Sequence, residues 1–380
     1  MRIDYSKRIF GLDVMRAVAI LLVVISHALW LVPETEGIIH DLLSLAGLIG
    51  VEIFFVLSGF LIGRIVLKMF FQENFNFNKV TYFWIRRWFR TLPNYYLVLV
   101  LNIFLMIGLG LQLPDNLWHY FFFVQNFAWE MPLFFSESWS LPIEEFAYIL
   151  GPLLLYLLFC FKIRIDKTKL FGLVTIIIIL LFTVTKIIYS FKTPDSDMMF
   201  WNVNLKSVTI YRIDAIYYGM LASYVAMINP KKWQKLSWIS FAIGVLIFLI
   251  LNFIIPKQGV YIETNPFFWN VFYLPINSIA ISFFLPVLSE LKNMNRFIVI
   301  PVTYISLISY SMYLLHYSII LQLLKHLVPS EDLSNLEILG FSSAYIISTI
   351  LLAYILYRVF EKPMMDIRDR QIFINRFIKD

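Results

Sequence analysis

An arginine and a histidine share one predicted helix face in the first apolar segment of the chain. The stretch GLDVMRAVAILLVVISHALWL, residues 11–31, is apolar enough to cross a bilayer, yet it contains Asp13, Arg16 and His27. Arg16 and His27 are eleven residues apart, which in an α-helix is three turns plus about 20°, and about 16 Å along the axis. Ionisable side chains inside a span are costly and typically face a cavity or a partner. The spacing therefore predicts one cavity with a cation and a proton-transfer group at different levels.

A simpler interpretation treats these residues separately. Arg16 then extends to the membrane interface and pairs with Asp13, which lies near the same stripe, while His27 packs between helices. The shared face favours the cavity.

A second polar stretch, ESWSLPIEEFAY, opens another apolar segment. In a helix, Ser140, Glu144 and Tyr148 share a face at i, i+4 and i+8, whereas Glu145 points elsewhere. A carboxylate there needs a basic partner or a proton, because burial disfavours its charge. The alternative is that Glu144 supports the start of the helix through the helix dipole.

Two further segments carry polar groups inside apolar surroundings. TIYRIDAIYYGML contains Arg212 and Asp214, and SYSMYLLHYS places Ser309, Tyr313 and His316 on one predicted face. Pairing between helices is the alternative for the first two, and a lone buried histidine is more often structural than catalytic.

An arginine cluster occurs in YFWIRRWFRTLP, where Arg87 and Arg90 lie one helical turn apart and Arg86 precedes them. Such aromatic and arginine belts commonly anchor a helix at the lipid headgroups. The functional alternative is an anion clamp, because guanidinium groups bind phosphate in a bidentate manner.

The composition decides what must position these residues. The chain has 380 residues, of which 60% are apolar and 15% charged, with a mean hydropathy of +0.77, so it is a membrane protein. We predict an all-α, polytopic helical bundle with about ten transmembrane helices. The predicted spans lie near 12–32, 47–69, 91–111, 140–161, 170–190, 206–228, 236–255, 268–290, 299–325 and 337–360.

The basic residues give a topology for these spans. Most of the 31 lysines and arginines fall in alternate loops, and loops rich in these residues stay in the cytoplasm. Both termini are therefore expected in the cytoplasm. The net charge of +6 reflects this asymmetry, and we predict no nucleic-acid partner. The single cysteine, Cys160, excludes a disulfide framework and a thiolate metal cluster. We interpret it as a buried structural thiol, and we predict no metal site.

Several motifs, taken in order, resemble a known family. GLDVMRAVAILLVVISH, GVEIFFVLSGFLIGR, RWFR, ESWSLPIEEFAY, YRIDAIYYGML, SYSMYLLH and FEKP occur between Arg8 and Pro363. The chain resembles acyltransferase family 3, the bacterial integral-membrane acyltransferases that O-acylate surface glycans. It departs from the family pattern at Phe146 and Ala147, where glutamine and phenylalanine are usual. The sequence ends soon after the last span, so it is similar to stand-alone members without a hydrolase-like domain.

The resemblance implies a donor, an acceptor and roles for the polar residues. The donor is a cytoplasmic acyl-CoA, expected to be acetyl-CoA, and the acceptor is a hydroxyl of an exported, cell-surface or lipid-linked glycan. His27 is the general base or a transient acyl carrier, and Glu144 orients it or binds the sugar. Residues predicted to bind the coenzyme are Arg16, Arg87 and Arg90; those predicted to bind the acceptor are Arg212, Asp214, His316 and Tyr148. Ser58 is interpreted as a helix-packing residue beside Gly59.

The resulting prediction is one transmembrane acyltransferase domain, residues 1–365, with a short basic cytoplasmic tail, 366–380. It places the protein in a bacterial cytoplasmic (inner) membrane, with membrane lipids and polysaccharide-assembly proteins as partners; the sequence does not give the oligomeric state. The alternative is a transporter or flippase of a lipid-linked glycan, which broken helices and intramembrane charges would also suit. A receptor or scaffold leaves the aligned Arg16 and His27 unexplained.

Overall fold

The computed structural model describes residues 8–31, 37–161, 164–193, 197–292, 294–328 and 333–370, and these residues form helices with no β-strand. Residues 371–380 of the predicted tail lie outside them. Nine helices of the described residues are long and apolar enough to cross a membrane, so the predicted all-α, polytopic bundle is confirmed. Four of these spans are single helices, namely α1 (Phe10–His27), α2 (Ile38–Phe70), α3 (Phe77–Gly108) and α6 (Lys167–Lys192). The other five join a helix to adjoining helical turns: Ser136–Cys160 with α5 (Ser140–Cys160), Ser237–Lys257 with α10 (Ser237–Leu249), Pro266–Glu290 with α13 (Leu274–Ser282), Arg296–Leu327 with α15 (Arg296–Leu315) and Leu336–Arg368 with α17 (Asn335–Leu356).

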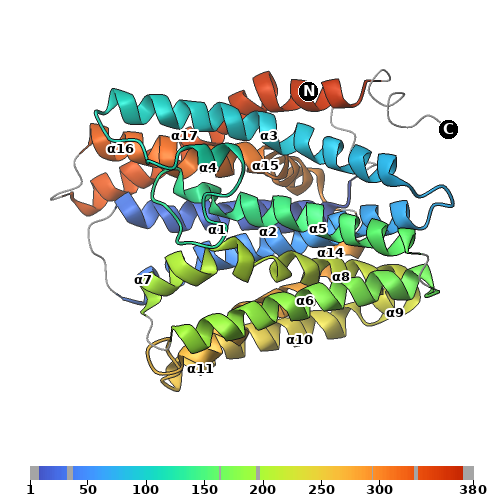
Figure 1. Cartoon of the computed structure of the whole chain (residues 1–380). Coiled ribbons are helices and arrows are strands. Elements are labelled where there is room, and N and C mark those ends of the chain that lie inside the picture. The colour runs from blue at the N-terminus through green and yellow to red at the C-terminus, as the bar shows by residue number, and fades with distance from the viewer. Residues whose placement is uncertain are drawn as a thin grey trace.

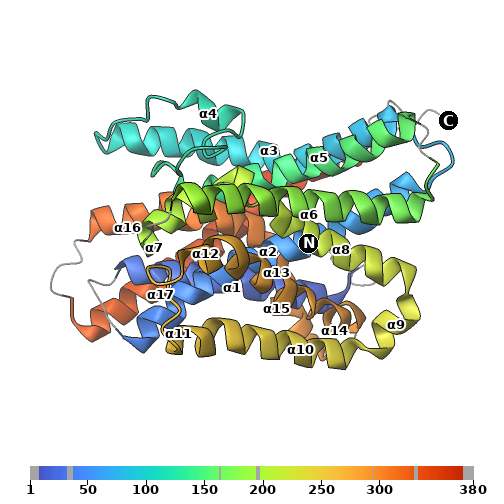
Figure 2. The ribbon, with the colours of Figure 1, turned by 60° about the horizontal axis from the view of Figure 1, so that its bottom comes forward.

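The predicted span at 206–228 is a broken segment rather than one long helix. Its helix α8 (Asp214–Ile228) has 15 residues, about 22 Å, which is short of the roughly 30 Å of the hydrocarbon core. Before it come α7 (Met198–Trp201), a π-helical turn at Asn202–Lys206 and a 3₁₀ turn at Thr209–Tyr211. The segment packs between α2 and α6 (Figure 2).

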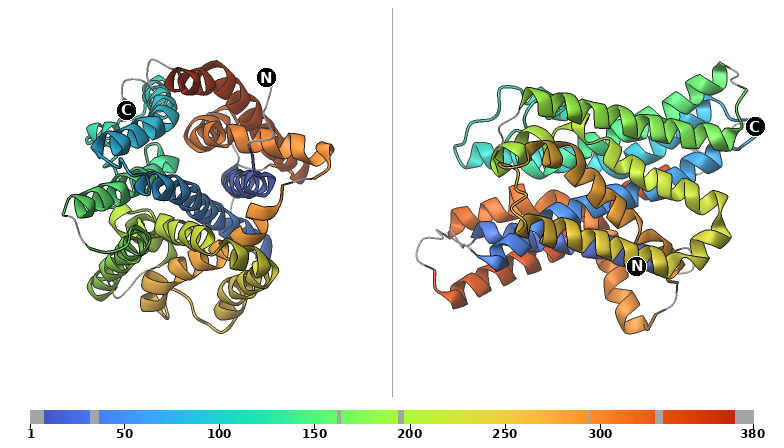
Figure 3. Two further views of the ribbon diagram at one scale, coloured as in Figure 1. Left: turned by 90° about the vertical axis from the view of Figure 1, so that its right-hand side faces the viewer. Right: turned by 90° about the horizontal axis from the view of Figure 1, so that it is seen from below.

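Small residues bring the central helices close together. Helix α1 lies inside the bundle against α2 and α15 (Figure 3). A Cβ added to Gly50 of α2 would lie 2.7 Å from the carbonyl oxygen of Ala19, and one added to Gly59 would lie 1.8 Å from that of Ile216. Helices without large side chains at the contact can approach this closely. These contacts fix the registers of α1 and α8 against α2.

The loops predicted to be cytoplasmic gather at one end of the bundle, at the right of Figure 1. The ammonium of Lys167, at the start of α6, donates to the carbonyls of Phe70 and Gln72 after α2. The amide of Gly11 donates to the carbonyl of Leu291, which follows α14 (Leu285–Glu290). The alternate loops that are rich in lysine and arginine thus lie at one end of the molecule.

Cys160 differs from its predicted environment. It is the last residue of α5, and its thiol is exposed rather than buried. The prediction of a buried structural thiol was wrong because the side chain points out of the bundle at the end of the helix.

Candidate active site

A cavity of about 500 Å³ opens between α1, α2, α3, α5 and α15. Its lining is strongly cationic: five basic side chains face it, against one carboxylate, Glu144. Buried like charges repel one another strongly in a low-dielectric interior, so this lining suits an anionic ligand. The five basic residues are Arg16, Arg64, Lys68, Arg87 and Arg90.

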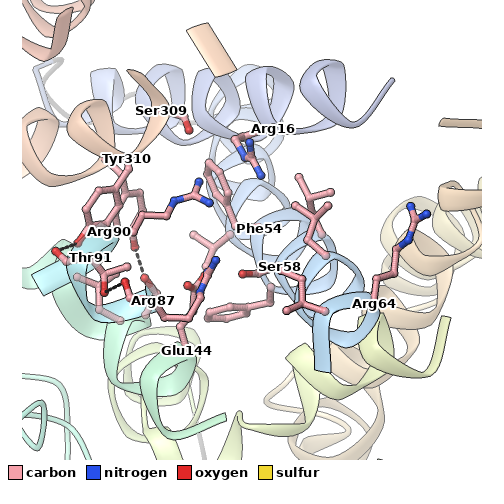
Figure 4. A pocket seen from close by; sticks show the side chains of 18 of the residues that line it. Arg16, Phe54, Ser58, Arg64, Arg87, Arg90, Thr91, Glu144, Ser309 and Tyr310 are labelled. Atoms are coloured by element: carbon pink, nitrogen blue, oxygen red, sulfur yellow. Dashed lines mark hydrogen bonds between the residues drawn. The ribbon is translucent and has the colours of Figure 1, made fainter. Parts of the chain in front are cut away.

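Arg16 projects into this cavity from α1, as its spacing predicted. Figure 4 shows its guanidinium converging with those of Arg87 and Arg90, and the three charges interact. Arg16 and Asp13 attract one another electrostatically, but among the described residues they form no direct ion pair. Asp13 instead forms an ion pair with Arg8, whose Nε lies 2.7 Å from its Oδ2.

Arg87 and Arg90 of α3 both line the cavity, whereas their neighbour Arg86 is engaged elsewhere. Arg86 pairs with Asp369 over 3.2 Å at the end of the chain that the structure describes. A hydrogen bond from Arg368 holds the pKa of the Asp369 carboxyl below its usual value. The Nε of Arg87 is buried without a hydrogen-bond partner, which is unusual for a buried donor. The two arginines are therefore available to an anion.

Tyr148 links three of the helices around the cavity, α2, α3 and α5. Its hydroxyl donates to Glu144 over 2.7 Å, accepts from Nη2 of Arg87 over 3.3 Å and hydrogen-bonds to Ser58 of α2. The Arg87 guanidinium also lies 4.8 Å from the centre of the Tyr148 ring. The prediction that Ser140, Glu144 and Tyr148 share a face is confirmed, since the first two line the cavity and the third bonds to the second.

The structure also tests the predictions for Glu145 and Ser58. Glu145 points away from the cavity, as predicted, and accepts from the Thr91 hydroxyl over 2.9 Å. The interpretation of Ser58 as a packing residue was wrong, because its hydroxyl faces the cavity. The close packing between α2 and α8 is made by its neighbour Gly59, which lies against the backbone of Ile216.

His27 forms a hydrogen-bonded pair with His316. Their Nδ1 and Nε2 atoms lie 2.8 Å apart, and Nδ1 of His316 lies 2.7 Å from the carbonyl oxygen of Tyr313. A carbonyl can only accept, so His316 carries its proton on Nδ1 when neutral, and its Nε2 accepts from Nδ1–H of His27. This arrangement leaves Nε2 of His27 with a free lone pair, suited to take a proton or attack a carbonyl.

Tyr313 lies between the cavity and the two histidines. It lines the cavity, which contains neither histidine. Its hydroxyl hydrogen-bonds to that of Ser140 over 2.7 Å, and its ring centre lies 5.7 Å from that of His316. The prediction of one cavity that contains both Arg16 and His27 was therefore wrong for this structure: Arg16 lines the cavity, His27 does not, and Tyr313 with Ser140 forms the layer of the cavity wall toward His316.

The register of α2 gives the separation of the two groups. Gly47 of α2 packs against Ser26, the neighbour of His27, and Ser58 reaches the arginine cluster through Tyr148. Eleven residues of helix separate Gly47 from Ser58, about 16 Å. The arginine cluster and the histidine pair thus lie at two levels of the bundle, as the sequence predicted.

Glu137 holds the turn that contains His316. It accepts from the backbone amide of Ser318 over 3.0 Å and from its hydroxyl over 2.6 Å. Ser318 belongs to a π-helical turn, His316–Leu321, and such turns frequently occur at functional sites. Sequence reasoning missed Glu137, although it lies in the same ESWS stretch as Ser140.

Lys206 was also missed. Its ammonium lies 5.3 Å from the centre of the Trp139 ring, and its positive charge acts on His27 and disfavours a second positive charge there. A cation next to the histidine pair can stabilise negative charge that develops there. Lys206 was not identified from the sequence because it lies at the boundary of the predicted span 206–228, where a lysine is typical of the end of a transmembrane helix.

Arg212 and Asp214 do not line the cavity. Arg212 pairs with Glu52 of α2, and Asp214 pairs with Lys186 of α6. All four side chains are at most 1% exposed, and Ser278 donates to the second oxygen of Glu52 over 3.0 Å. Contact of Arg212 and Asp214 with the acceptor stays a prediction. A charge in the middle of an apolar span, as at Glu52 and Lys186, was the signal that could have identified these partners.

Glu144 is placed near the arginines rather than near His27. Its hydrogen bond is to Tyr148, and the charges that act on it are those of Arg87, Arg90 and Arg16. The predicted orientation of His27 by Glu144 is not seen among the contacts of the described residues, and its binding of the sugar stays a prediction.

Three curated relatives of the chain have O-acetyltransferase in their names. The chain is 25% identical to the peptidoglycan O-acetyltransferase OatA of Listeria monocytogenes, over 83% of this chain and 50% of that protein. It is 25% identical to the putative peptidoglycan O-acetyltransferase YrhL of Bacillus subtilis, over 98% and 58%. The O-acetyltransferase OatA of Staphylococcus aureus is 29% identical, over 95% and 58%. The chain therefore spans between half and three-fifths of the length of these relatives.

No solved structure matches the chain significantly. A family model described as an acyltransferase domain matches residues 9–358, which include the cavity, the arginine cluster and the histidine pair. With nearly the whole sequence matched, this multi-pass membrane protein belongs to acyltransferase family 3.

Proposed function

We propose that the protein transfers an acetyl group from cytoplasmic acetyl-CoA to a hydroxyl of a cell-wall glycan on the other side of a bacterial cytoplasmic membrane. The observation that carries this proposal is the pairing of an arginine-lined cavity with a bonded histidine pair about 16 Å away along the same helices. The names of the relatives support the acetyl group and the glycan acceptor.

The cavity would hold the phosphate-bearing part of the donor. Arg16, Arg87 and Arg90 supply three guanidinium groups to one space, and such groups bind phosphate oxygens through paired N–H donors. The pantetheine arm of the coenzyme is about as long as the separation of Arg16 from His27. The thioester can therefore approach His27 while the nucleotide stays at the arginines.

His27 would act through Nε2. It takes the proton of the acceptor hydroxyl as the oxygen attacks the thioester carbonyl; the C–O bond forms, the C–S bond breaks, and the departing thiolate receives the proton. Proton transfer of this kind contributes about 10²- to 10⁴-fold in rate. In the second route, Nε2 attacks the carbonyl first, so that an N–C bond forms as the C–S bond breaks and coenzyme A leaves as its thiolate. The sugar oxygen then attacks the acetyl carbon, the N–C bond breaks, and the hydroxyl proton passes to the freed Nε2 and from there to the thiolate.

Transfer requires Tyr313 and Ser140 to move apart, so that the donor cavity becomes connected to His27. The Ser140–Tyr313 hydrogen bond and the ring contacts of Tyr313 close the cavity below the histidines. We propose that this side chain moves when the thioester enters, so that donor and acceptor sides are connected only during transfer.

The proposed setting follows from the topology. Basic loops at one end of the bundle support a cytoplasmic location for both termini and for the open side of the arginine cavity. The acceptor would then approach from the side of His27, with Lys206, Arg212, Asp214 and His316 around its path and polysaccharide-assembly proteins supplying it.

The test is acetyl transfer by the purified protein in lipid vesicles, with labelled acetyl-CoA on the side of the basic loops and a soluble glycan fragment on the other. We expect labelled ester on the glycan, and we expect His27→Ala to abolish it. His326→Ala is the matched control, because His326 lies in α16 (Gln322–Leu327) and is exposed.

Three results separate the alternatives. Label that stays on the protein and depends on His27 identifies the acyl-histidine route. Movement of glycan across the vesicle without thioester turnover supports the transporter instead. Full activity of His27→Ala excludes both proposed roles of this residue.

A further inference from the structure

The basic residues of the cavity form two groups along α2. The first, Arg16, Arg87 and Arg90, lies at the level of Ser58, which reaches Arg87 through Tyr148. The second consists of Arg64 and Lys68, which follow Ser58 by six and ten residues on the same wall. At 1.5 Å per residue, these two lie about 9 and 15 Å farther toward the end of the basic loops. Figure 4 shows Arg64 beyond Ser58 and apart from the three converging arginines.

Arg64 is placed to receive a ligand. Its guanidinium lies 5.6 Å from the centre of the Phe60 ring, and no carboxylate of the described residues lies within ion-pair distance of it. Lys68, one turn farther on, is exposed and likewise has no carboxylate partner there. Lys167, at the same end of the bundle, differs because its ammonium is bound by two backbone carbonyls.

Headgroup anchoring does not account for both positions. A topology anchor faces the lipid around the bundle, whereas Arg64 and Lys68 line the cavity that contains Arg87. With Glu144, the five basic residues give the cavity a formal charge of +4. Coenzyme A carries about four negative charges at neutral pH, of which close to two belong to its 3′-phosphate.

We propose that Arg64 and Lys68 form a second anion subsite, which binds the 3′-phosphate on the ribose of the donor while the diphosphate lies at Arg16, Arg87 and Arg90. This inference rests on the proposed function and restricts the chemical class of its acyl donor. The donor must have two phosphate groups separated by a ribose. Acyl phosphates and acyl-phosphopantetheine lack the second group, so the subsite selects coenzyme A esters over both.

The experiment compares acetyl-CoA with acetyl-3′-dephospho-CoA in the vesicle assay. The wild-type protein is expected to prefer acetyl-CoA by about tenfold in kcat/KM, because a phosphate bound by a partly exposed arginine and lysine contributes a charge-assisted but partly screened interaction. In Arg64→Gln the preference should fall to about twofold, through loss of activity with acetyl-CoA and little change with the dephospho donor. Lys68→Gln should move the preference in the same direction.

Lys169→Gln is the control, because Lys169 is exposed at the start of α6 at the same end of the bundle and does not line the cavity. It should keep the wild-type preference. If Arg64→Gln reduces kcat/KM equally for both donors, or changes neither, the subsite is wrong although the proposed function stands. If the wild-type protein uses neither donor, the proposed function fails and the subsite fails with it.

A binding measurement keeps the inference testable if a variant transfers poorly. Adenosine 3′,5′-bisphosphate should compete with acetyl-CoA for the solubilised wild-type protein about tenfold better than adenosine 5′-monophosphate. Arg64→Gln should remove this difference. Equal competition by the two nucleotides on the wild-type protein would overturn the assignment.

Discussion

The imidazoles of His27 and His316 are joined by a hydrogen bond of 2.8 Å between Nδ1 of the first and Nε2 of the second. The other nitrogen of His316, Nδ1, donates to the carbonyl of Tyr313. When both imidazoles are neutral, this hydrogen bond therefore sets the proton positions on His316 and on His27. A single backbone carbonyl on α15 thereby determines that Nε2 of His27 is the basic atom.

The first prediction concerns His316 as a positioning residue. His316→Leu removes the acceptor for Nδ1–H of His27, so the imidazole loses its fixed tautomer and orientation. We expect kcat for acetyl transfer to fall by about 10- to 100-fold, which is within the contribution of proton transfer as a whole. The KM for acetyl-CoA should change less than twofold, because the donor phosphates bind elsewhere.

Rescue distinguishes positioning from a structural role. The amide oxygen of Gln can accept from Nδ1–H of His27, so His316→Gln should recover part of the lost kcat and shift the pH profile relative to the wild-type protein. Equal losses in the Leu and Gln variants, with an unchanged pH profile, would contradict the assignment.

The second prediction concerns the closed layer at Tyr313. Tyr313→Phe and Ser140→Ala each remove their mutual hydrogen bond while the ring of residue 313 or the helix at 140 is kept. A hydrogen bond of this kind contributes about 1 kcal/mol, so the layer should open more often. We expect hydrolysis of acetyl-CoA without acceptor to rise about fivefold in both variants.

Tyr96→Phe is the matched control for this test. It removes a tyrosine hydrogen bond to the carbonyl of Phe121, neither residue lines the cavity, and acceptor-free hydrolysis should stay unchanged. If Tyr313→Phe and Ser140→Ala behave like this control, the layer does not govern access to the histidines.

The sequence predicts geometry within a helix well. The 3.6-residue period alone places Ser140 and Glu144 on the cavity wall and turns Glu145 away. The same period puts Arg16 and His27 on one face at two levels. These relationships depend on one helix at a time, so no knowledge of its neighbours is needed.

Relationships between helices were not predictable in the same way. Whether His27 meets His316, and whether Arg212 meets Glu52, depends on the rotation and register of separate helices. Those are set by close contacts such as that of Gly59 with α8, which do not appear as a periodic pattern. The broken segment before α8 escaped prediction because π-helical and 3₁₀ turns retain the apolar composition of a continuous span.

The third prediction concerns guanidinium geometry at the donor site. Arg87→Lys keeps the positive charge but loses the paired N–H donors and the stacking on Tyr148. We expect the KM for acetyl-CoA to rise about tenfold with kcat changed less than twofold. Steady-state kinetics with acetyl-CoA as the varied substrate measures both constants.

Arg86→Lys is the control for the third prediction. Arg86 is the preceding residue on the same helix, but it pairs with Asp369 outside the cavity, so the KM should stay within twofold of the wild-type value. A similar rise of the KM in both variants would show that any Arg→Lys change in this part of α3 raises the KM, whether or not the residue lines the cavity.

The last prediction separates the structural and acceptor-binding interpretations of Asp214. Lys186→Met leaves the Asp214 carboxylate buried without its cation, which should cost about 3–5 kcal/mol of folding stability. Replacing both partners, in Lys186→Met with Asp214→Leu, removes the unpaired charge and should restore most of the thermal stability measured in detergent. If the pair is structural, this double variant also keeps glycan acetylation. A double variant that is stable and still hydrolyses acetyl-CoA, but no longer acetylates the glycan, would instead place Asp214 in contact with the acceptor.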